Sequence, residues 1–317
     1  MNYRRLGKAG VKVSPLCLGA GVRGQLDESR FTRTIHRAID LGCNFFDCAN
    51  NYGGGRSETL LGQAIKGKRD DLVITSKVRT RVGPGPNDEG LSRYHIMRVV
   101  EHSLSKLQTD HIDIYYLHQV DPETELAETL RTMEDLVRQG KVRYVGASNH
   151  NAAQVIELLW TAERLGLEPI VCLQNQYNLL HRWKMEPEVL DVCRRYGLGL
   201  VTYSPLAIGL LSGRFRRGIT PPADTPWTAE RLDEVLHDQT EYVIQTLCDL
   251  AAVRNATPAQ LATAWLLDHP EVTAPIVGAD RPEYVDDVFG ALEITLTRQE
   301  RQILDDASQW KTPEQYL

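Results

Sequence analysis

Short runs rich in β-branched and aromatic residues alternate along the chain with longer segments that have the apolar spacing of amphipathic helices. Eight runs predict strands, at residues 15–19, 44–48, 72–78, 112–118, 142–146, 171–174, 198–203 and 274–278. Helical spacing is found near residues 29–41, 57–66, 92–106, 124–138, 151–165, 185–196, 239–254 and 280–291. Strands that alternate with helices are typical of a parallel sheet. The pattern therefore predicts an α/β protein.

The punctuation between these segments favours one closed barrel over two domains. Helix starts are predicted at Ser57, Asn151 and Thr257–Pro258, and helix ends at Gly42, Gly140 and Gly197. No Gly/Ser-rich or Pro-rich linker separates two halves of the chain. We therefore expect a (β/α)8 TIM barrel that forms a single domain over residues 1–317.

Two segments lie outside the alternating pattern. Residues 3–13 resemble a small β-hairpin that can cover the bottom of the barrel. Residues 206–238 are rich in glycine and then proline and have no strong periodicity, which predicts a long functional loop on the C-terminal face.

Composition narrows the possible partners. The chain has 317 residues, of which 42% are hydrophobic and 25% charged, and this balance excludes a disordered or fibrous protein. A net charge of -6 disfavours nucleic acid and anionic membranes as partners. The most apolar stretch, residues 197–213, is too short to span a membrane, and no signal-peptide pattern follows Met1. We therefore expect a cytoplasmic protein. We also expect its six cysteines to be reduced, since no C-x-x-C pair occurs.

Titratable residues stand where three successive predicted strands end. The second strand ends with Asp47, and the loop after it holds Tyr52. The third strand ends near Lys77, and the fourth ends at His118. Each alone has an ordinary explanation, as a helix cap, a surface charge or a core residue. Together they occupy the rim that carries the chemistry of parallel barrels.

These four residue types together suit the donation of a proton to a carbonyl oxygen. A tyrosine holds its proton at neutral pH, a neighbouring ammonium eases its release, and a carboxylate keeps that ammonium charged. His118 can hydrogen-bond the same oxygen. Because this set supplies an acid and no nucleophile, the electrons must come from elsewhere, and a nicotinamide hydride fits.

The segment from Phe46 to Gly62 reads F-D-C-A-N-N-Y-G-G-G-R-S-E-T-L-L-G. It resembles the aldo-keto reductase pattern F-D-T-A-x-x-Y-G-x-G-x-S-E-x-x-L-G, with Cys48 in place of threonine. The resemblance continues at residues 74–77, 113–118, 140–149, 203–206 and 209–211, and spans residues 1 to about 292. These motifs resemble those of the branch that includes the potassium-channel β subunits and related bacterial reductases. It implies a catalytic tetrad of Tyr52, as the acid, with Asp47, Lys77 and His118.

The same resemblance implies a set of cofactor contacts. Ser148, Asn149 and Gln174 match positions that bind the nicotinamide carboxamide, and Tyr203 matches the aromatic residue that stacks on the nicotinamide, with core packing as its alternative. Further matching positions are Ser204, Leu206, Gly209, Leu210, Ser212 and Arg214 in the seventh βα loop, and Gly278, Asp280, Arg281, Tyr284 and Asp287 in the eighth. Residues 19–24 read G-A-G-V-R-G directly after the first strand, but this spacing alone is a weak signal for dinucleotide binding. The eight alternating strands and helices disfavour a Rossmann domain.

The choice between cofactors stays open on sequence grounds. Arg281 can bind a 2′-phosphate, which favours NADP(H). Asp280 would repel that phosphate and suits a free 2′-hydroxyl, so NAD(H) or dual use is the alternative. Tyr284 and Val288 also depart from the family pattern, where glutamine and asparagine are usual.

Three arginines follow strand ends on the same rim: Arg23, Arg79 and Arg81. They would suit a carboxylate or phosphate on the substrate, and the alternative is that they are exposed loop charges.

The resemblance implies an NADP(H)-dependent reductase of an aldehyde or ketone, such as a sugar-like or anionic carbonyl compound. The alternative is a cofactor-binding regulatory subunit with little turnover.

A metal-dependent hydrolase is disfavoured, since no His-x-His or carboxylate cluster stands at a strand end. The sequence identifies neither the physiological substrate nor the direction of the reaction. It does not distinguish a monomer from a homo-oligomer.

Overall fold

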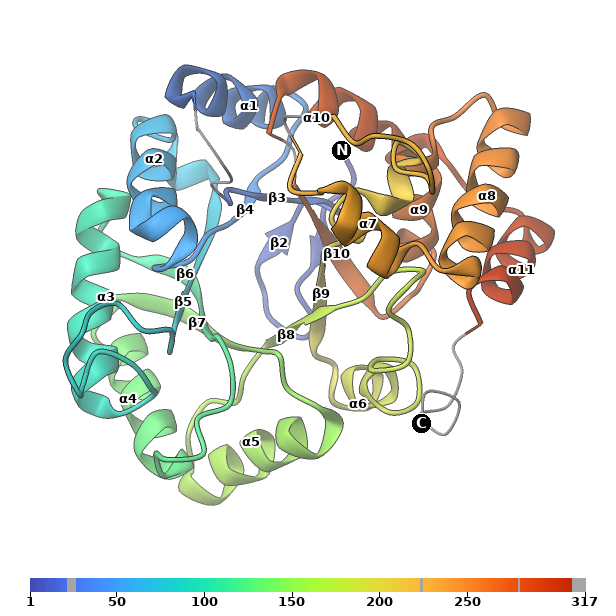
Figure 1. Ribbon diagram of the computed structural model, residues 1–317. Coiled ribbons are helices and arrows are strands. Elements are labelled where there is room, and N and C mark those ends of the chain that lie inside the picture. The colour runs from blue at the N-terminus through green and yellow to red at the C-terminus, as the bar shows by residue number, and fades with distance from the viewer. Residues whose placement is uncertain (22–26, 223–224, 279, 310–317) are drawn as a thin grey trace.

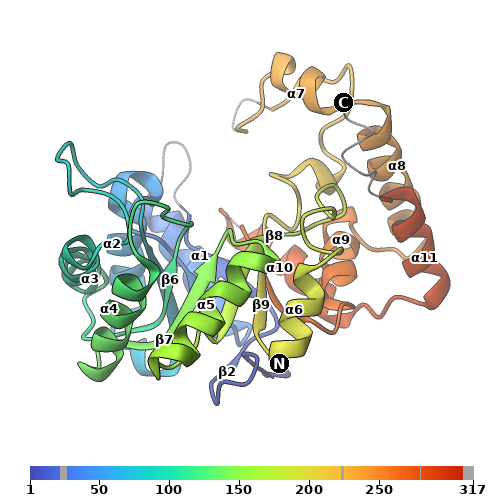
Figure 2. The same cartoon turned by 90° about the horizontal axis from the view of Figure 1, so that it is seen from below.

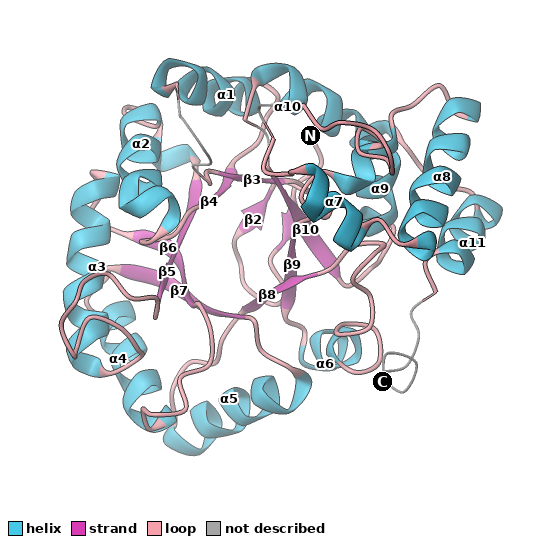
Figure 3. Ribbon diagram, in the orientation of Figure 1, coloured by secondary structure: helices cyan, strands magenta, loops and turns pink. Residues whose placement is uncertain are grey.

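A ring of eight parallel strands forms the centre of the computed structural model, which describes residues 1–21, 27–222, 225–278 and 280–309. Neighbouring strands pair in the closed order β10-β3-β4-β5-β6-β7-β8-β9. Their bounds are β3 Cys17–Gly19, β4 Phe45–Asp47, β5 Val73–Val78, β6 Ile112–Leu117, β7 Val142–Ser148, β8 Cys172–Gln176, β9 Gly199–Tyr203 and β10 Val272–Val277. Helices surround the ring (Figures 1 and 3). The predicted (β/α)8 barrel is confirmed.

Eight of the helices correspond to the predicted ones, with ends that differ by a few residues. They are α1 Glu28–Asp40, α2 Arg56–Ala64, α3 Arg93–Leu107, α4 Leu126–Arg138, α5 Ala152–Leu165, α6 Val189–Tyr196, α8 Asp238–Val253 and α10 Pro282–Phe289. Three more helices were not among the predicted segments: α7 Ala229–Val235, α9 Pro258–Leu267 and α11 Arg298–Ala307. Four short 3-10 helices are η1 Tyr52–Gly55, η2 Arg69–Asp71, η3 Leu210–Ser212 and η4 Gly290–Glu293.

Two of the three predicted helix starts coincide with observed helix caps. Asn151 and Thr257 each form a capping box, with their side chains bonded to the backbone of Gln154 and Gln260. The helix predicted to start at Ser57 begins one residue earlier, at Arg56, and Ser57 is not its cap. Gly55 precedes the helix, and the Ser57 hydroxyl donates to the carbonyl of Ala20 at 2.6 Å, so it ties α2 to the barrel instead.

The N-terminal hairpin closes one end of the barrel, as predicted. Strands β1 (Arg4–Arg5) and β2 (Lys12–Val13) pair antiparallel, and the fully buried Leu6 and Val13 pack into the apolar barrel interior. Gly7 has φ of 57°, and a Cβ there would lie 2.3 Å from the backbone nitrogen of Gly199, so only glycine fits. Figure 2 shows β2 at one end of the barrel and α7 beyond the other.

The long loop after β9 lies on that other, C-terminal side. It contains η3 and α7, and the Trp227 indole donates to the carbonyl of Ile208 at 2.9 Å while its ring packs against Phe215. These contacts hold two distant parts of the loop together.

The six cysteines are free thiols, which confirms the prediction for them; Cys248 is half-buried and the others are buried. Within the described ranges, no helix combines the length and the apolar character that crossing a membrane requires.

Candidate active site

A buried ion pair lies at the C-terminal end of the barrel. Asp47 is the last residue of β4, and Lys77 is next to last in β5. The Lys77 Nζ lies 2.6 Å from Asp47 Oδ2 and donates to the carbonyl of Cys48 at 2.8 Å. Asp47 Oδ1 accepts from Thr75 Oγ1 at 2.6 Å and from Gln174 Nε2 at 2.8 Å. Since a buried pair is stable only when its remaining lone pairs and protons are satisfied, these bonds fix both charges in place.

The surroundings of Lys77 keep it protonated. Burial alone would lower the pKa of its ammonium, but the charge and hydrogen bond of Asp47 outweigh burial and raise the pKa above its ordinary value. The Lys77 ammonium therefore stays charged at any physiological pH.

Tyr52 lies in η1, directly after β4, with the Lys77 Nζ 4.7 Å from its ring centroid. Burial raises the pKa of the Tyr52 hydroxyl, and Lys77 lowers it, but by less than burial raises it. Lys77 thus acts in the expected direction without controlling the net shift. Tyr52 retains its proton at neutral pH, as an acid must.

His118 follows β6 and completes the group of four predicted catalytic residues. Its ring lies edge-on to Tyr52, with 6.0 Å between ring centroids, and its Nδ1 is 3.2 Å from the Thr80 hydroxyl. Burial, followed by the charge of Lys77, lowers the pKa of His118 to about 4. His118 is therefore neutral at pH 7, so it can orient a carbonyl oxygen through a hydrogen bond.

The four residues expected to surround the nicotinamide are also brought together. The Asn149 side-chain amide donates to the carbonyl of His118 at 2.9 Å and to Ser148 Oγ at 3.1 Å. Its oxygen accepts from the Tyr203 hydroxyl at 2.7 Å, and its backbone N–H donates to Gln174 O at 3.1 Å. Tyr203 is half-buried at the end of β9 and packs partly against the barrel interior, which agrees with the alternative of core packing and leaves part of the side chain exposed.

The seventh βα loop has the backbone expected of a segment that wraps a phosphate. Ser204, Ala207, Ile208 and Gly209 have φ values between 47° and 91°, which turn the chain sharply. The Ser204 carbonyl accepts from Asn178 Nδ2 at 2.8 Å, and Ser212 Oγ donates to the Gly209 carbonyl at 2.6 Å.

The side chain of Leu210 packs in the core, and that of Leu206 packs partly against it. A ligand at this loop would therefore meet mainly its backbone.

Side chains of the seventh and eighth loops meet at Tyr284. Arg214 donates to the Tyr284 hydroxyl at 2.9 Å, and the guanidinium groups of Arg214 and Arg281 lie 5.7 and 5.5 Å from the Tyr284 ring centroid. Two guanidinium groups over one aromatic ring form a cationic cluster. Gly278 and Asp280 are exposed beside it.

Asp287 and Val288 lie in helix α10 and do not take part in this cluster. The Asp287 carboxylate accepts from Thr257 Oγ1 at 2.8 Å, at the start of α9. Val288 is buried.

Two of the three rim arginines, Arg79 and Arg81, lie among the described residues, and their surroundings differ. Arg23 lies outside the described residues. Arg81 pairs with Glu89 at 2.5 Å, so its charge is already matched within its own loop, and the alternative of an exposed loop charge holds for it. Arg79 directly follows β5, and its Nε is buried without a hydrogen bond.

Three polar residues of the site were missed by the sequence analysis. Thr75 has a recognisable signal, since it stands two residues before Lys77 on the same face of β5. Thr80 lies in a loop and gives no such signal. Glu58 lies fully buried in α2, where it accepts from the Ser76 hydroxyl at 2.6 Å; it belongs to the recognised motif, but its burial was not visible.

The residues present fit a nicotinamide cofactor. A half-buried aromatic ring lies beside amide and hydroxyl groups at the strand ends, and a cationic cluster lies at the seventh and eighth loops. Across the described ranges, no group of three or more His, Cys, Asp or Glu side chains is placed to hold a metal ion.

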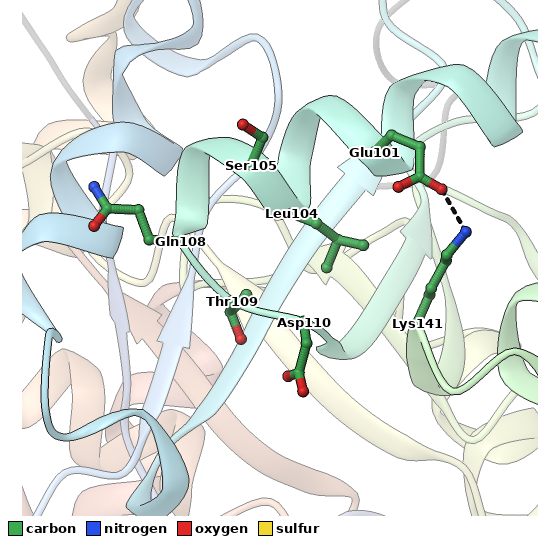
Figure 4. Close-up of a pocket in the computed structure, with 7 residues that line it drawn as sticks. All are labelled: Glu101, Leu104, Ser105, Gln108, Thr109, Asp110 and Lys141. Carbon is green, nitrogen blue, oxygen red and sulfur yellow. Dashed lines mark hydrogen bonds and ion pairs between the residues drawn. The ribbon is translucent and has the colours of Figure 1, made fainter.

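A surface depression of about 600 Å³ lies at the opposite end of the barrel (Figure 4). It is lined by Glu101, Leu104, Ser105, Gln108, Thr109, Asp110 and Lys141, of which Lys141 and Glu101 form an ion pair. It includes none of the predicted site residues.

Comparison with known proteins agrees with this geometry. Residues 15–309 match the aldo/keto reductase family. Two relatives, from Arabidopsis thaliana and Oryza sativa subsp. japonica, are each called a probable voltage-gated potassium channel subunit beta; each is 37% identical over 303 residues, which cover 93% of this chain and 92% of the relative.

A third relative is the uncharacterized oxidoreductase YrpG of Bacillus subtilis (strain 168), which is 38% identical over 332 aligned residues that cover 100% of this chain and 99% of the relative. With such matches along almost its whole length, the chain belongs to the aldo/keto reductase family, in the branch that the sequence motifs predicted.

Proposed function

We propose that this oxidoreductase reduces an aldehyde or ketone to the alcohol with NADP(H), using Tyr52 as the general acid. The observation that carries the proposal is the buried Lys77–Asp47 pair at 2.6 Å beside the Tyr52 ring, with a neutral His118 edge-on to Tyr52. A bound reduced nicotinamide supplies the hydride to the carbonyl carbon.

The chain's own residues then manage the proton. Tyr52 holds its proton because burial raises its pKa, and it donates this proton to the carbonyl oxygen. The negative charge that develops on the phenol oxygen lies next to Lys77, whose ammonium Asp47 keeps charged. His118 donates a hydrogen bond that orients the carbonyl.

The cofactor would be held at three places. Tyr203 and Asn149, with Ser148 and Gln174, would hold the nicotinamide, and the backbone of residues 204–212 would wrap the pyrophosphate. Arg281 and Arg214 would bind a 2′-phosphate, which supports NADP(H) as the first choice. The exposed Asp280 supports NAD(H) as the alternative.

A second candidate function is a regulatory subunit that binds the cofactor with little turnover. The names of the two plant relatives favour it. The complete set of Tyr52, Lys77, Asp47 and His118 favours turnover, because a binding protein has no need of a buried acid and its ion pair.

We also propose that residues 1–317 act as one domain in the cytoplasm, on a small-molecule substrate, as a monomer or homo-oligomer. The family match over residues 15–309 and the continuous ring of strands support the single domain. The free thiols support a reducing compartment.

The test is a steady-state assay that follows the absorbance band of the reduced nicotinamide. The protein is mixed with NADPH or NADH and a panel of aldehydes, ketones and keto-sugars. Carbonyl-dependent loss of the band supports the reductase. Tight cofactor binding without turnover on any member of the panel would favour the regulatory subunit.

A further inference from the structure

Arg79 has a backbone conformation that is rare for a residue with a side chain. It stands two residues beyond Lys77, and its φ is 134°. The chain is fixed on both sides of this point: the Gly90 N–H donates to the Arg79 carbonyl at 2.8 Å, and the His118 N–H donates to the Val78 carbonyl at 2.9 Å. Such strain persists only where the surroundings impose it, and it is concentrated at functional sites.

The other arginines of this region have carboxylate partners. Arg81 pairs with Glu89, and Arg93 pairs with Asp135. Arg98 likewise pairs with Asp88. These contacts match each positive charge within the protein.

The Arg79 side chain has no such partner. Its Nε is buried without a hydrogen bond, and no carboxylate of the described ranges lies within ion-pair distance of its guanidinium. The Asp121 carboxylate is near enough for the Arg79 charge to help lower the pKa of Asp121, but its hydrogen bonds come from the Leu91 N–H at 2.6 Å and from Thr124 Oγ1 at 2.7 Å, and none within the described ranges comes from Arg79.

The guanidinium nevertheless acts on the catalytic group. Its charge is among the causes that lower the pKa of His118, after burial and Lys77. The next residue, Thr80, touches the His118 ring. Lys77 is paired with Asp47 and His118 is uncharged, whereas the Arg79 guanidinium has no direct ion pair among the described residues and can still donate to a ligand.

We propose that Arg79 binds a carboxylate or phosphate group on the carbonyl substrate, so that the enzyme prefers anionic aldehydes to neutral ones of the same shape. A guanidinium offers planar paired donors that match both oxyanions. The inference rests on the proposed carbonyl reduction and names the substrate class for the same site.

The experiment compares matched substrates. One pair is 4-carboxybenzaldehyde and its neutral methyl ester, and the other is glyceraldehyde 3-phosphate and glyceraldehyde. The variants are Arg79→Met and Arg79→Gly, with Arg81→Met as the matched control. Arg79→Gly also removes the strain at φ 134°, so it should fold at least as well as the wild type.

In the wild type, kcat/KM should favour the anionic member of at least one pair, and the pair that responds identifies a carboxylate or a phosphate. Both Arg79 variants should lower kcat/KM for that anionic member by roughly tenfold to a hundredfold and for its neutral partner by less than about twofold. Arg81→Met should leave both unchanged.

Equal kcat/KM for charged and neutral members in the wild type would overturn this inference, and so would equal losses on both members in the Arg79 variants. In either case the neutral substrates would still be reduced, and the proposed function would stand. Absence of reduction of all four substrates would instead remove the proposed function together with this inference.

Discussion

The two sides of the catalytic rim are built differently. On the β4–β6 side, the charged groups of Asp47 and Lys77 lie on strands, are fully buried, and make hydrogen bonds of 2.6 to 2.8 Å. On the β9–β10 side, Arg214 and Arg281 lie on loops, partly open to solvent, over one aromatic ring. Proton transfer needs charges fixed in a low dielectric, whereas phosphate binding needs donors that a ligand can reach.

This difference predicts how substitutions will act. Changes on the β4–β6 side should reduce the chemical rate and, where a buried charge loses its partner, the stability. Changes on the β9–β10 side should alter cofactor affinity and leave stability nearly unchanged.

The largest effect is expected for Lys77→Met. The loss of the ammonium removes the charge that stabilises the developing tyrosinate, so kcat should fall by about 10²- to 10⁴-fold. It also leaves Asp47 buried without its partner, which should cost about 3–5 kcal/mol of unfolding free energy. Steady-state kinetics and urea unfolding measure the two effects. A change in KM alone would make Lys77 a substrate-binding residue.

The second prediction concerns acid stability. The pKa of His118 is about 4 in the folded protein and about 6.5 in an unfolded chain, so the unfolded state binds more protons between these values. The contribution to stability is complete above pH 6.5 and is lost as the pH falls toward 4, with a loss of about 3 kcal/mol from this residue.

Urea unfolding at several pH values, for the wild type and for His118→Gln, isolates this contribution. The variant should lose less stability between pH 6.5 and 4 than the wild type. The same pKa predicts that kcat/KM shows no ionisation of His118 near pH 6.5. Identical pH dependence of stability in the two proteins would contradict the neutral His118.

On the cofactor side, Arg281→Ala should weaken NADPH binding by roughly tenfold to a hundredfold and NADH binding far less, because it removes a charge-assisted contact to the 2′-phosphate. Asp280→Ser should strengthen NADPH binding, since it removes a like charge. Fluorescence titration of both cofactors measures these changes. Equal effects of Arg281→Ala on the two cofactors would show that Arg281 does not read the 2′-phosphate.

The smallest effect is expected for Thr80→Val, which keeps the shape and removes the hydroxyl 3.2 Å from His118 Nδ1. A neutral hydrogen bond contributes about 1 kcal/mol, so kcat should fall by about fivefold with little change in KM. Thr246→Val, on the outer helix α8, is the control. An unchanged kcat would show that Thr80 does not orient His118.

The strand-borne side could be predicted from the sequence because parallel strands bring their ends to one rim. An apolar run that ends at Asp47, Lys77 or His118 carries that information within a few residues. The environment of Arg79 could not be predicted. It depends on Gly90 closing the loop and on Glu89 pairing with Arg81 instead, and neither contact leaves a local pattern.

The three helices that were not predicted also lack a clear pattern in the sequence. Helix α9 is buried along most of its length, so it lacks a polar face and its period is hidden, although its start at Thr257 was recognised. In helix α11 half of the residues are charged and only Leu304 and Ala307 are buried. Helix α7 follows a proline-rich segment and has only one buried residue, Leu232.

The most direct test of the central claim is a single-turnover experiment on Tyr52→Phe. The substitution removes one proton donor and no expected cofactor contact. With saturating NADPH and a reducible aldehyde, hydride transfer should be slower than in the wild type by about 10²- to 10⁴-fold, while a fluorescence titration gives an NADPH Kd within about twofold of the wild-type value. Wild-type rates of hydride transfer in Tyr52→Phe would contradict Tyr52 as the acid.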